Sequence, residues 1–200
     1  MMYCILIAGM PATGKSSFAY WLSQKRNLPY MSKDTIKEIM FDSIGFKSRS
    51  EKVALGIAAR NILYYFAEEQ MKVEHPFILE NNFEYSSREG ILRLLEKYGC
   101  LPITVLFDGN IEVIYKRFIT RDQSPERHRG HIVNTEYPEK GEKAPYIPVK
   151  LETFKSNMEK RGFHKFDVGG TTVKVDCTDF NQVDYEAINR RLDNIILSCH

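Results

Sequence analysis

The sequence has little net charge, no long hydrophobic run and no closely paired cysteines. Its 200 residues carry a formal charge of +2, so no strong positive field draws the whole chain to nucleic acid or to an anionic membrane. No hydrophobic run approaches the ~18 residues of a membrane-spanning helix. The run at residues 3–8 is too short for a signal peptide and has no basic residue before it. We therefore expect a cytoplasmic protein without a membrane partner.

Cysteine, glycine and proline are all scarce. The four cysteines, Cys4, Cys100, Cys177 and Cys199, are far apart and form no C-x-x-C pair, which disfavours a disulfide framework or a zinc site. With 12 glycines, 8 prolines and 43% hydrophobic residues, the chain is neither collagen-like nor of low complexity. Cys4 and Cys177 lie in strand-like patterns, where a cysteine is most often a small core residue.

Hydrophobic runs of strand length alternate with helical patterns along the whole chain. Strands are expected at residues 3–8, 28–31, 76–79, 101–107 and 172–177. Helices are expected at 15–25, after Ser32, after the capping-box sequences at 48–51 and 86–89, at 111–118 and from 185 onwards. This alternation predicts a single α/β domain over residues 1–200, with a parallel sheet between two layers of helices.

A basic segment without periodicity follows the fourth predicted strand. Five Lys or Arg residues face two acidic residues between Lys116 and His131, and the irregular region continues to about Pro148. Long irregular segments in compact domains are typically functional loops, so we expect a lid at residues 122–148. Arg117 and Arg121 share one helix face and are candidates to cover a transferring phosphoryl group. The alternative is a solvated basic face.

The most specific motif lies between the first strand and the first helix. Residues 9–16 fit G-x-x-x-x-G-K-[ST] without a gap, in the strand–loop–helix context that a phosphate-binding loop requires. Backbone N–H groups and the helix N-terminus favour phosphate there, Lys15 is expected to reach the β- and γ-phosphates, and Ser16 to hold Mg²⁺. The predicted nucleotide-binding residues are Gly9, Pro11, Ala12, Thr13, Gly14, Lys15, Ser16, Ser17 and Arg117.

The loop alone does not distinguish a kinase from a GTPase. Residues 42–45 and 181–184 only approach the GTPase motifs D-x-x-G and N-K-x-D. Asp34 favours a kinase, because a carboxylate in the first turn of the second helix is placed to accept the proton of an attacking hydroxyl. It equally complements a helix dipole. Glu80 and Asn81 end the third predicted strand. Glu80 is a candidate to hold a water bound to Mg²⁺, and Asn81 is a candidate to contact substrate. The alternative is that both belong to a polar turn.

Five segments together resemble small P-loop kinases of the polynucleotide-kinase, zeta-toxin and antibiotic-phosphotransferase branch, which is often called AAA-like. They are AGMPATGKSS, MSKDTIKEIM, ILENNF, RFITRDQSPERHRGH and VKVDCTDF. The resemblance implies ATP and Mg²⁺ at Lys15 and Ser16, Asp34 as the base, lid arginines at 117 and 121, and the sheet order 2-3-1-4-5. Polynucleotide kinases typically carry Asp-x-x-Arg, but the fourth residue here is Lys37, a substrate-site candidate without the bidentate fork of arginine.

We therefore expect an ATP- and Mg²⁺-dependent kinase that phosphorylates a hydroxyl of a small molecule or nucleotide. Asp34, Lys37 and Asn81 are the expected substrate residues, and Ser16 and Glu80 the metal ligands. Residues 178–180 are expected to hold adenine with the lid helix. The alternatives are a 5′-hydroxyl polynucleotide kinase, which the modest charge disfavours, and a nucleotide-dependent switch or binding protein.

Overall fold

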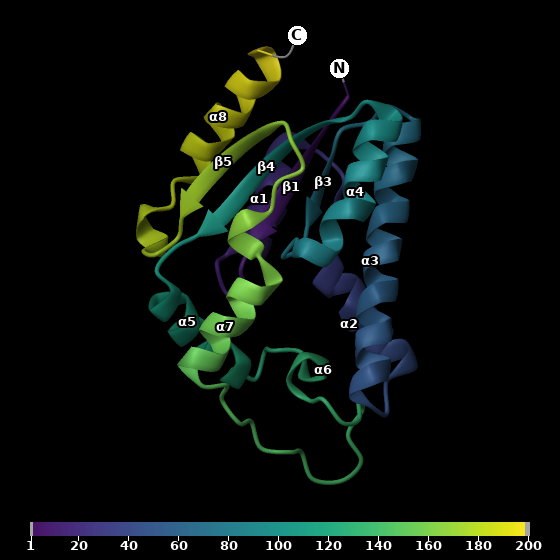
Figure 1. The fold of residues 1–200 in the computed structure, drawn as a ribbon, viewed down its shortest axis with the longest axis vertical. Coiled ribbons are helices and arrows are strands. Elements are labelled where there is room, and N and C mark those ends of the chain that lie inside the picture. Colours follow the sequence, from purple (N-terminus) through teal and green to yellow (C-terminus); the bar gives the residue numbers. More distant parts are fainter. Residues whose placement is uncertain (1, 199–200) are drawn as a thin grey trace.

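Five parallel strands form one twisted sheet in the computed structural model, which describes residues 2–198 (Figure 1). The strands are β1 (Tyr3–Gly9), β2 (Tyr30–Ser32), β3 (Phe77–Glu80), β4 (Leu101–Asp108) and β5 (Thr171–Asp176). Their spatial order is β2-β3-β1-β4-β5, with β1 central and parallel to both β3 and β4. The expected order is confirmed.

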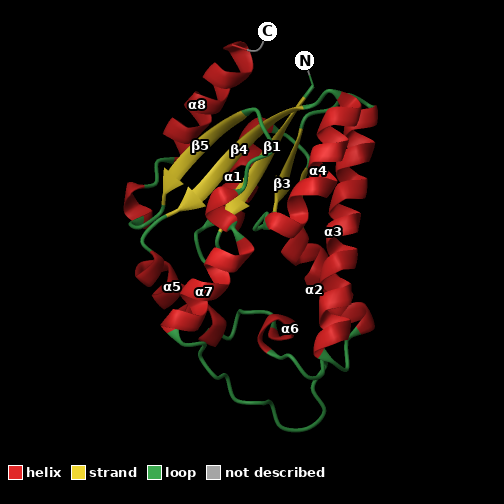
Figure 2. Cartoon of the chain, viewed as in Figure 1, coloured by secondary structure: helices red, strands yellow, loops and turns green. Residues whose placement is uncertain are grey.

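Helices cover both faces of this sheet (Figure 2). Along β1 the side chains alternate: Ile5 and Ile7 join a core with α1 (Lys15–Arg26) and α8 (Tyr185–Ser198). Leu6 and Ala8 join a second core with α3 (Arg49–Lys72) and α4 (Tyr85–Tyr98). Because β1 is buried on both faces, it reads as one continuous hydrophobic run. The three-layer α/β architecture is confirmed.

Helix beginnings show where local sequence decides and where it does not. Ser48 caps α3 as expected, since its hydroxyl accepts a hydrogen bond from the backbone N–H of Glu51 at 3.2 Å. The capping box expected at 86–89 is wrong: α4 already begins at Tyr85, after Glu84. Ser32 precedes α2 (Lys33–Ile44), but its side chain makes no cap. Its hydroxyl bonds to Glu80 instead.

Residues 122–148 lie beyond the sheet and contact α2 and α3. They begin in the last residues of α5 (Ile111–Gln123), contain the short α6 (Arg129–Ile132) and lead to α7 (Leu151–Arg161), a helix the sequence patterns did not predict. Phe41, Phe46 and Val133 form a small third core here, with Leu55 and Tyr137 packed against it. The backbones of Phe46 and Tyr137 exchange two hydrogen bonds of 2.8 Å. In Figure 1 this green chain passes below the sheet.

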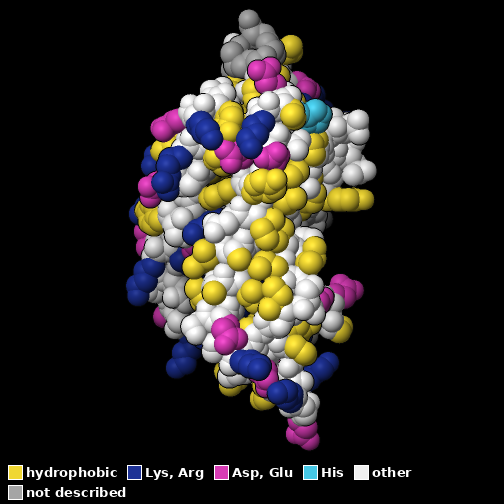
Figure 3. Space-filling model, turned by 90° about the vertical axis from the view of Figure 1, so that its right-hand side faces the viewer, with side chains coloured by type: hydrophobic (Ala, Val, Ile, Leu, Met, Phe, Trp, Pro, Cys, Tyr) yellow, Lys and Arg dark blue, Asp and Glu magenta, His cyan; other side chains and the backbone are white. Residues whose placement is uncertain are grey.

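Short 3-10 turns at Phe163–Lys165 and Phe180–Gln182 complete the secondary structure of the described chain. Hydrophobic side chains gather on the outer face beside α3 (Figure 3), where Val53, Ile57, Ile62 and Tyr65 are exposed. No helix within residues 2–198 combines the length and hydrophobicity needed to span a membrane. Cys4, Cys100 and Cys177 are buried free thiols, and Cys199 lies outside the described residues.

Candidate active site

The phosphate loop is fixed by the strands beneath it. Gly9 ends β1 with φ 132°, and a Cβ there would lie 2.1 Å from the carbonyl oxygen of Phe107 in β4, so no larger residue fits. Thr13 and Lys15 both donate to the carbonyl oxygen of Met10, at 2.8 and 2.7 Å. Gly14 (φ 84°) then leads into α1. The loop therefore closes around its own backbone at the N-terminus of a helix.

Lys15 is the buried cation of this loop. Its side chain is almost fully enclosed. Burial lowers the pKa of Lys15, while the nearby carboxylates of Glu80 and Asp34 raise it. A buried ammonium at the N-terminus of a helix is an arrangement that binds phosphate.

Glu80 and Ser32 meet at the carboxyl ends of two strands. The register of β2 against β3 pairs the two residues, and the Ser32 hydroxyl donates to Glu80 Oε2 at 2.5 Å. Burial raises the pKa of Glu80, whereas Lys15 and the hydroxyls of Ser32 and Ser16 lower it. Hydroxyl and carboxylate oxygens are the donors that Mg²⁺ prefers. Ser16 and Glu80 therefore fit the magnesium site expected there.

Asp34 is a half-buried carboxylate surrounded by cations. It lies in the first turn of α2, as predicted. Burial favours its neutral form, but His131, Lys37, Arg127 and Lys33 outweigh burial and bring its pKa to about 2. Asp34 is therefore ionised at every physiological pH and available as a hydrogen-bond acceptor.

One cavity of about 350 Å³ connects the phosphate loop with Asp34. Glu38 and Asn82 also border it, and two arginines close it, Arg121 and Arg127. Arg121 donates to Asp122 at 2.9 Å. The buried Nε of Arg127 has no hydrogen-bond partner among the described residues, although Asp122 lies 3.5 Å away. The cavity thus places cations opposite the loop, where a transferring phosphoryl group needs them.

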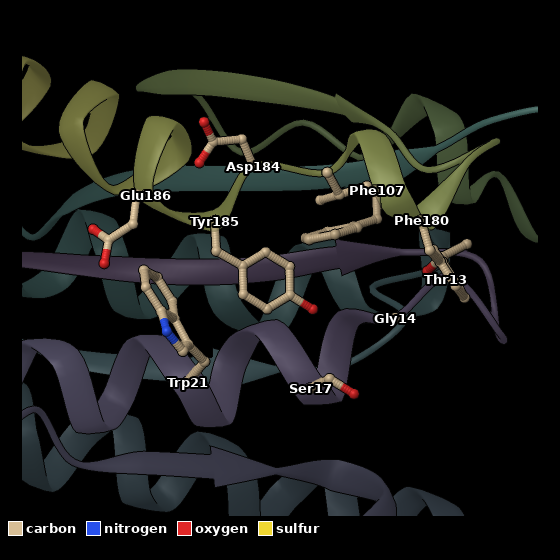
Figure 4. A pocket seen from close by; sticks show the side chains of 10 residues that line it. Thr13, Gly14, Ser17, Trp21, Phe107, Phe180, Asp184, Tyr185 and Glu186 are labelled. Carbon is tan, nitrogen blue, oxygen red and sulfur yellow. The ribbon is translucent and has the colours of Figure 1, made fainter.

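Arg117 lies outside this cavity. Its guanidinium donates to the carbonyl oxygens of Cys177 and Thr178, and it stacks over the Phe180 ring, 3.6 Å from the ring centre. Phe180 also borders a second cavity of about 430 Å³, which has Trp21 and Tyr185 on its wall (Figure 4). An aromatic-lined space beside the phosphate loop suits a nucleobase better than a phosphate.

Polar contacts hold residues 128–137 against α2 and α3. Lys52 is buried and donates to the carbonyl oxygens of His131 and Val133, at 2.9 and 2.5 Å. His131 pairs with Glu38 at 2.8 Å, which brings the segment to the rim of the Asp34 cavity. Burial, followed by repulsion from Lys37, Arg49 and Arg127, lowers the pKa of Lys52 to about 7.

Residues 4–134 match the family described as AAA domain. The chain belongs to this family. Among curated proteins, none matches the sequence. In solved structures, the fold is similar to a "putative kinase" from Chloroflexus aurantiacus J-10-fl, with 27% identity, TM-score 0.79, and 96% of this chain and 97% of that chain covered.

Two further structures share the fold at lower identity. One is a sugar kinase from Janibacter sp. HTCC2649, with 12% identity, TM-score 0.56, and 98% of this chain and 95% of that chain covered. The other is a gluconokinase from Sinorhizobium meliloti 1021, with 15% identity, TM-score 0.52, and 99% and 98% covered. The expected resemblance to small P-loop kinases is confirmed, and the P-loop kinase fold supports a phosphotransferase.

Most of the predicted site residues border the cavity between the phosphate loop and Asp34. They are Ala12, Thr13, Gly14, Lys15, Ser16, Ser17, Asp34, Glu80 and Arg121. Gly9, Pro11, Lys37 and Asn81 are not among the residues that line it. Asn81 is buried and its amide lies 3.5 Å from the Ser87 hydroxyl, while Asn82 borders the cavity. Sequence reasoning noted Arg127 only as part of a basic run. Its place opposite the loop depends on how residues 122–148 fold back, which no local pattern encodes.

Proposed function

We propose that the protein is an ATP- and Mg²⁺-dependent phosphotransferase that moves the γ-phosphate of ATP to a hydroxyl group. The observation that carries this proposal is the shared cavity of Lys15, Asp34 and Arg127. A protein that only binds nucleotide needs the loop but has no use for a carboxylate and a second set of cations facing it. A kinase needs all three.

Each group then has a distinct task in the reaction. The phosphate loop and Lys15 would hold the phosphates of ATP, and Ser16 and Glu80 would hold Mg²⁺, which would supply positive charge beside those phosphates. Asp34 accepts a hydrogen bond from the acceptor hydroxyl and aligns its oxygen with the γ-phosphorus. Its low pKa makes it a weak base, so it takes the proton late, as the new O–P bond forms.

The arginines act on the opposite side of the transferring group. Arg121 and Arg127 face the equatorial oxygens, where negative charge is stabilised during transfer. Residues 122–148 serve as a lid that carries Arg127 over the bound phosphates and excludes water. Arg117 and Phe180 contribute to the nucleobase side.

The test is transfer of label from γ-labelled ATP in the presence of Mg²⁺. Wild type and Asp34→Asn are compared against a pool of sugars, sugar acids, nucleosides and aminoglycosides, with 5′-hydroxyl oligonucleotides in a separate arm. We expect label on a small-molecule acceptor, reduced at least about 100-fold by Asp34→Asn with little change in ATP affinity. Label on oligonucleotides alone would indicate a polynucleotide kinase. Label released only as inorganic phosphate in every arm would contradict phosphotransfer.

A further inference from the structure

Lys33 and Lys37 flank Asp34 on α2, one helical turn apart, and therefore share a face of the helix. Both side chains are half-buried. The Lys37 chain crosses towards α3, since its Cε lies 3.9 Å from the position a Cβ would take on Gly56. Its ammonium lies 5.3 Å from the centre of the Phe41 ring. The Lys37 side chain therefore lies between α2 and α3, and the Lys33 side chain is half-buried beside Asp34.

Other cations around Asp34 and Lys33 already have a carboxylate within ion-pair distance or a hydrogen-bond acceptor. His131 and Arg127 lie 2.8 and 3.9 Å from Glu38, and Arg161 donates to Glu84 at 2.6 Å. Arg60, on the neighbouring face of α3, donates to the carbonyl oxygen and the hydroxyl of Ser86.

Lys33 and Lys37 differ from these cations. Within residues 2–198, neither ammonium makes a hydrogen bond or an ion pair. The pair is therefore set apart from the structural ion pairs of the site.

The charge around this pair is not balanced. Burial lowers the pKa of both lysines. Asp34 opposes this effect at both, and Glu84 also opposes it at Lys33. Glu84 already accepts a hydrogen bond from Arg161, and the proposed function commits Asp34 to the acceptor hydroxyl. Half-buried cations that make no hydrogen bond or ion pair are costly unless a ligand pairs with them.

We propose that the phosphate acceptor is a small hydroxyl compound that carries its own anionic group, a carboxylate or a phosphate, and that Lys33 and Lys37 bind this group. The inference rests on the proposed function and specifies its substrate class. A neutral polyol of the same size leaves both ammonium groups unpaired. The lysines hold the anion on the α3 side of Asp34, which leaves the hydroxyl directed towards the phosphate loop.

Binding of the anion also makes Asp34 a stronger base. Lys37 and Lys33 are two of the four cations that lower the pKa of Asp34. When a substrate anion neutralises them, the pKa of Asp34 rises towards its usual value and proton transfer becomes easier. The acceptor then activates the carboxylate that deprotonates it, and the γ-phosphoryl group of ATP is transferred less readily to neutral hydroxyls, including water, with ADP as the leaving group in each case.

The test compares acceptors that differ only in charge. Gluconate is paired with sorbitol, and ribose 5-phosphate with ribose, so the two arms separate carboxylate from phosphate. We expect kcat/KM for one anion to exceed that of its neutral partner at least about 50-fold. In the double variant Lys33→Gln, Lys37→Gln this ratio falls below about 5, through a raised KM for the anion, while the KM for ATP stays within about 2-fold. Lys160→Gln, an exposed lysine on α7, is the matched control.

A binding measurement decides the proposal even if none of the four compounds takes label. Calorimetric titration of gluconate and of ribose 5-phosphate is carried out on the protein saturated with a non-hydrolysable ATP analogue and Mg²⁺. Binding that is lost in the double lysine variant and kept in Lys160→Gln supports the anion site, and the absence of transfer then counts against the proposed function alone. Equal use of neutral and anionic acceptors, or no binding of either anion, overturns the anion site.

Discussion

The phosphate loop and the 122–148 segment face each other across one cavity but are held in different ways. The loop directly follows β1, whose residues 4–8 are fully buried, and Gly9 packs closely against the backbone of β4. The segment rests on a core of three buried residues and on separate polar contacts. A catalytic site needs one side that never moves and one side that can open for substrate. On the proposed function, the phosphate loop is the side that stays fixed, and the less extensively packed 122–148 segment is the side that opens.

The largest effect on activity is expected in the phosphate loop. Lys15→Ala should reduce phosphoryl transfer by about 10³-fold or more, because it removes the buried cation from the loop. The fold should persist, since the Lys15 side chain makes its hydrogen bond only to Met10 of the same loop. Steady-state kinetics and circular dichroism measure both. Lys25→Ala, on the exposed end of the same helix, is the control, and equal turnover in the two variants would contradict the loop's role.

The 122–148 segment should unfold locally when its small core is weakened. Phe41→Ala removes the centre of the small third core, a change that costs about 3–5 kcal/mol at buried phenylalanines. We expect faster hydrogen exchange and proteolysis within 128–137, with the sheet protected as in wild type. Phe66→Ala, at the interface of α3 and β3, is the control. Exchange rates that rise equally across the chain would mean that the segment and the sheet unfold as one unit.

The sequence patterns predicted the fold of the phosphate loop and its flanking strand and helix well, because the residues that determine it are close in sequence. Consecutive buried residues, a loop motif and a helix start lie within residues 3–26. The position of the 122–148 segment depends on contacts between residues that are distant in sequence, such as Lys52 with His131 and Phe46 with Tyr137. Ser32 shows the limit of local prediction. Its position predicts a helix cap, but the register of β2 and β3 brings it next to Glu80, and its hydroxyl donates to that carboxylate instead.

Asp34 links the two sides, and its ionisation should be visible in stability. Its pKa in the folded protein, about 2, lies below the ordinary value of 3.8. The carboxylate therefore stabilises the fold above pH 3.8, and this contribution is lost as pH falls towards 2. We expect Asp34→Asn to lower the free energy of unfolding by about 2 kcal/mol at pH 7, with a smaller difference below pH 4. Urea titrations against Asp184→Asn measure it, and a pH-independent difference would contradict the cause given.

The smallest effect is expected at the nucleobase side. Phe180→Ala should raise the KM for ATP about 3- to 10-fold, because the ring stacks on Arg117 and forms a wall of the aromatic cavity. Turnover at saturating ATP should change less than about 2-fold. Tyr20→Ala, an exposed aromatic on α1, is the control. A lower KM for ATP in Phe180→Ala would show that the ring obstructs the base rather than supporting it.

The central position of β1 has a consequence for how the protein is made. β1 is synthesised first, yet its two neighbours, β3 and β4, begin only at Phe77 and Leu101. At roughly 5–20 residues per second, the most hydrophobic strand of the sheet waits about 3 to 14 seconds for its first partner. Chaperone binding to residues 3–9 is therefore expected to compete with aggregation during translation. A bound nucleotide can assist folding only later, once β4 has also been synthesised and the loop has a strand on each side of β1.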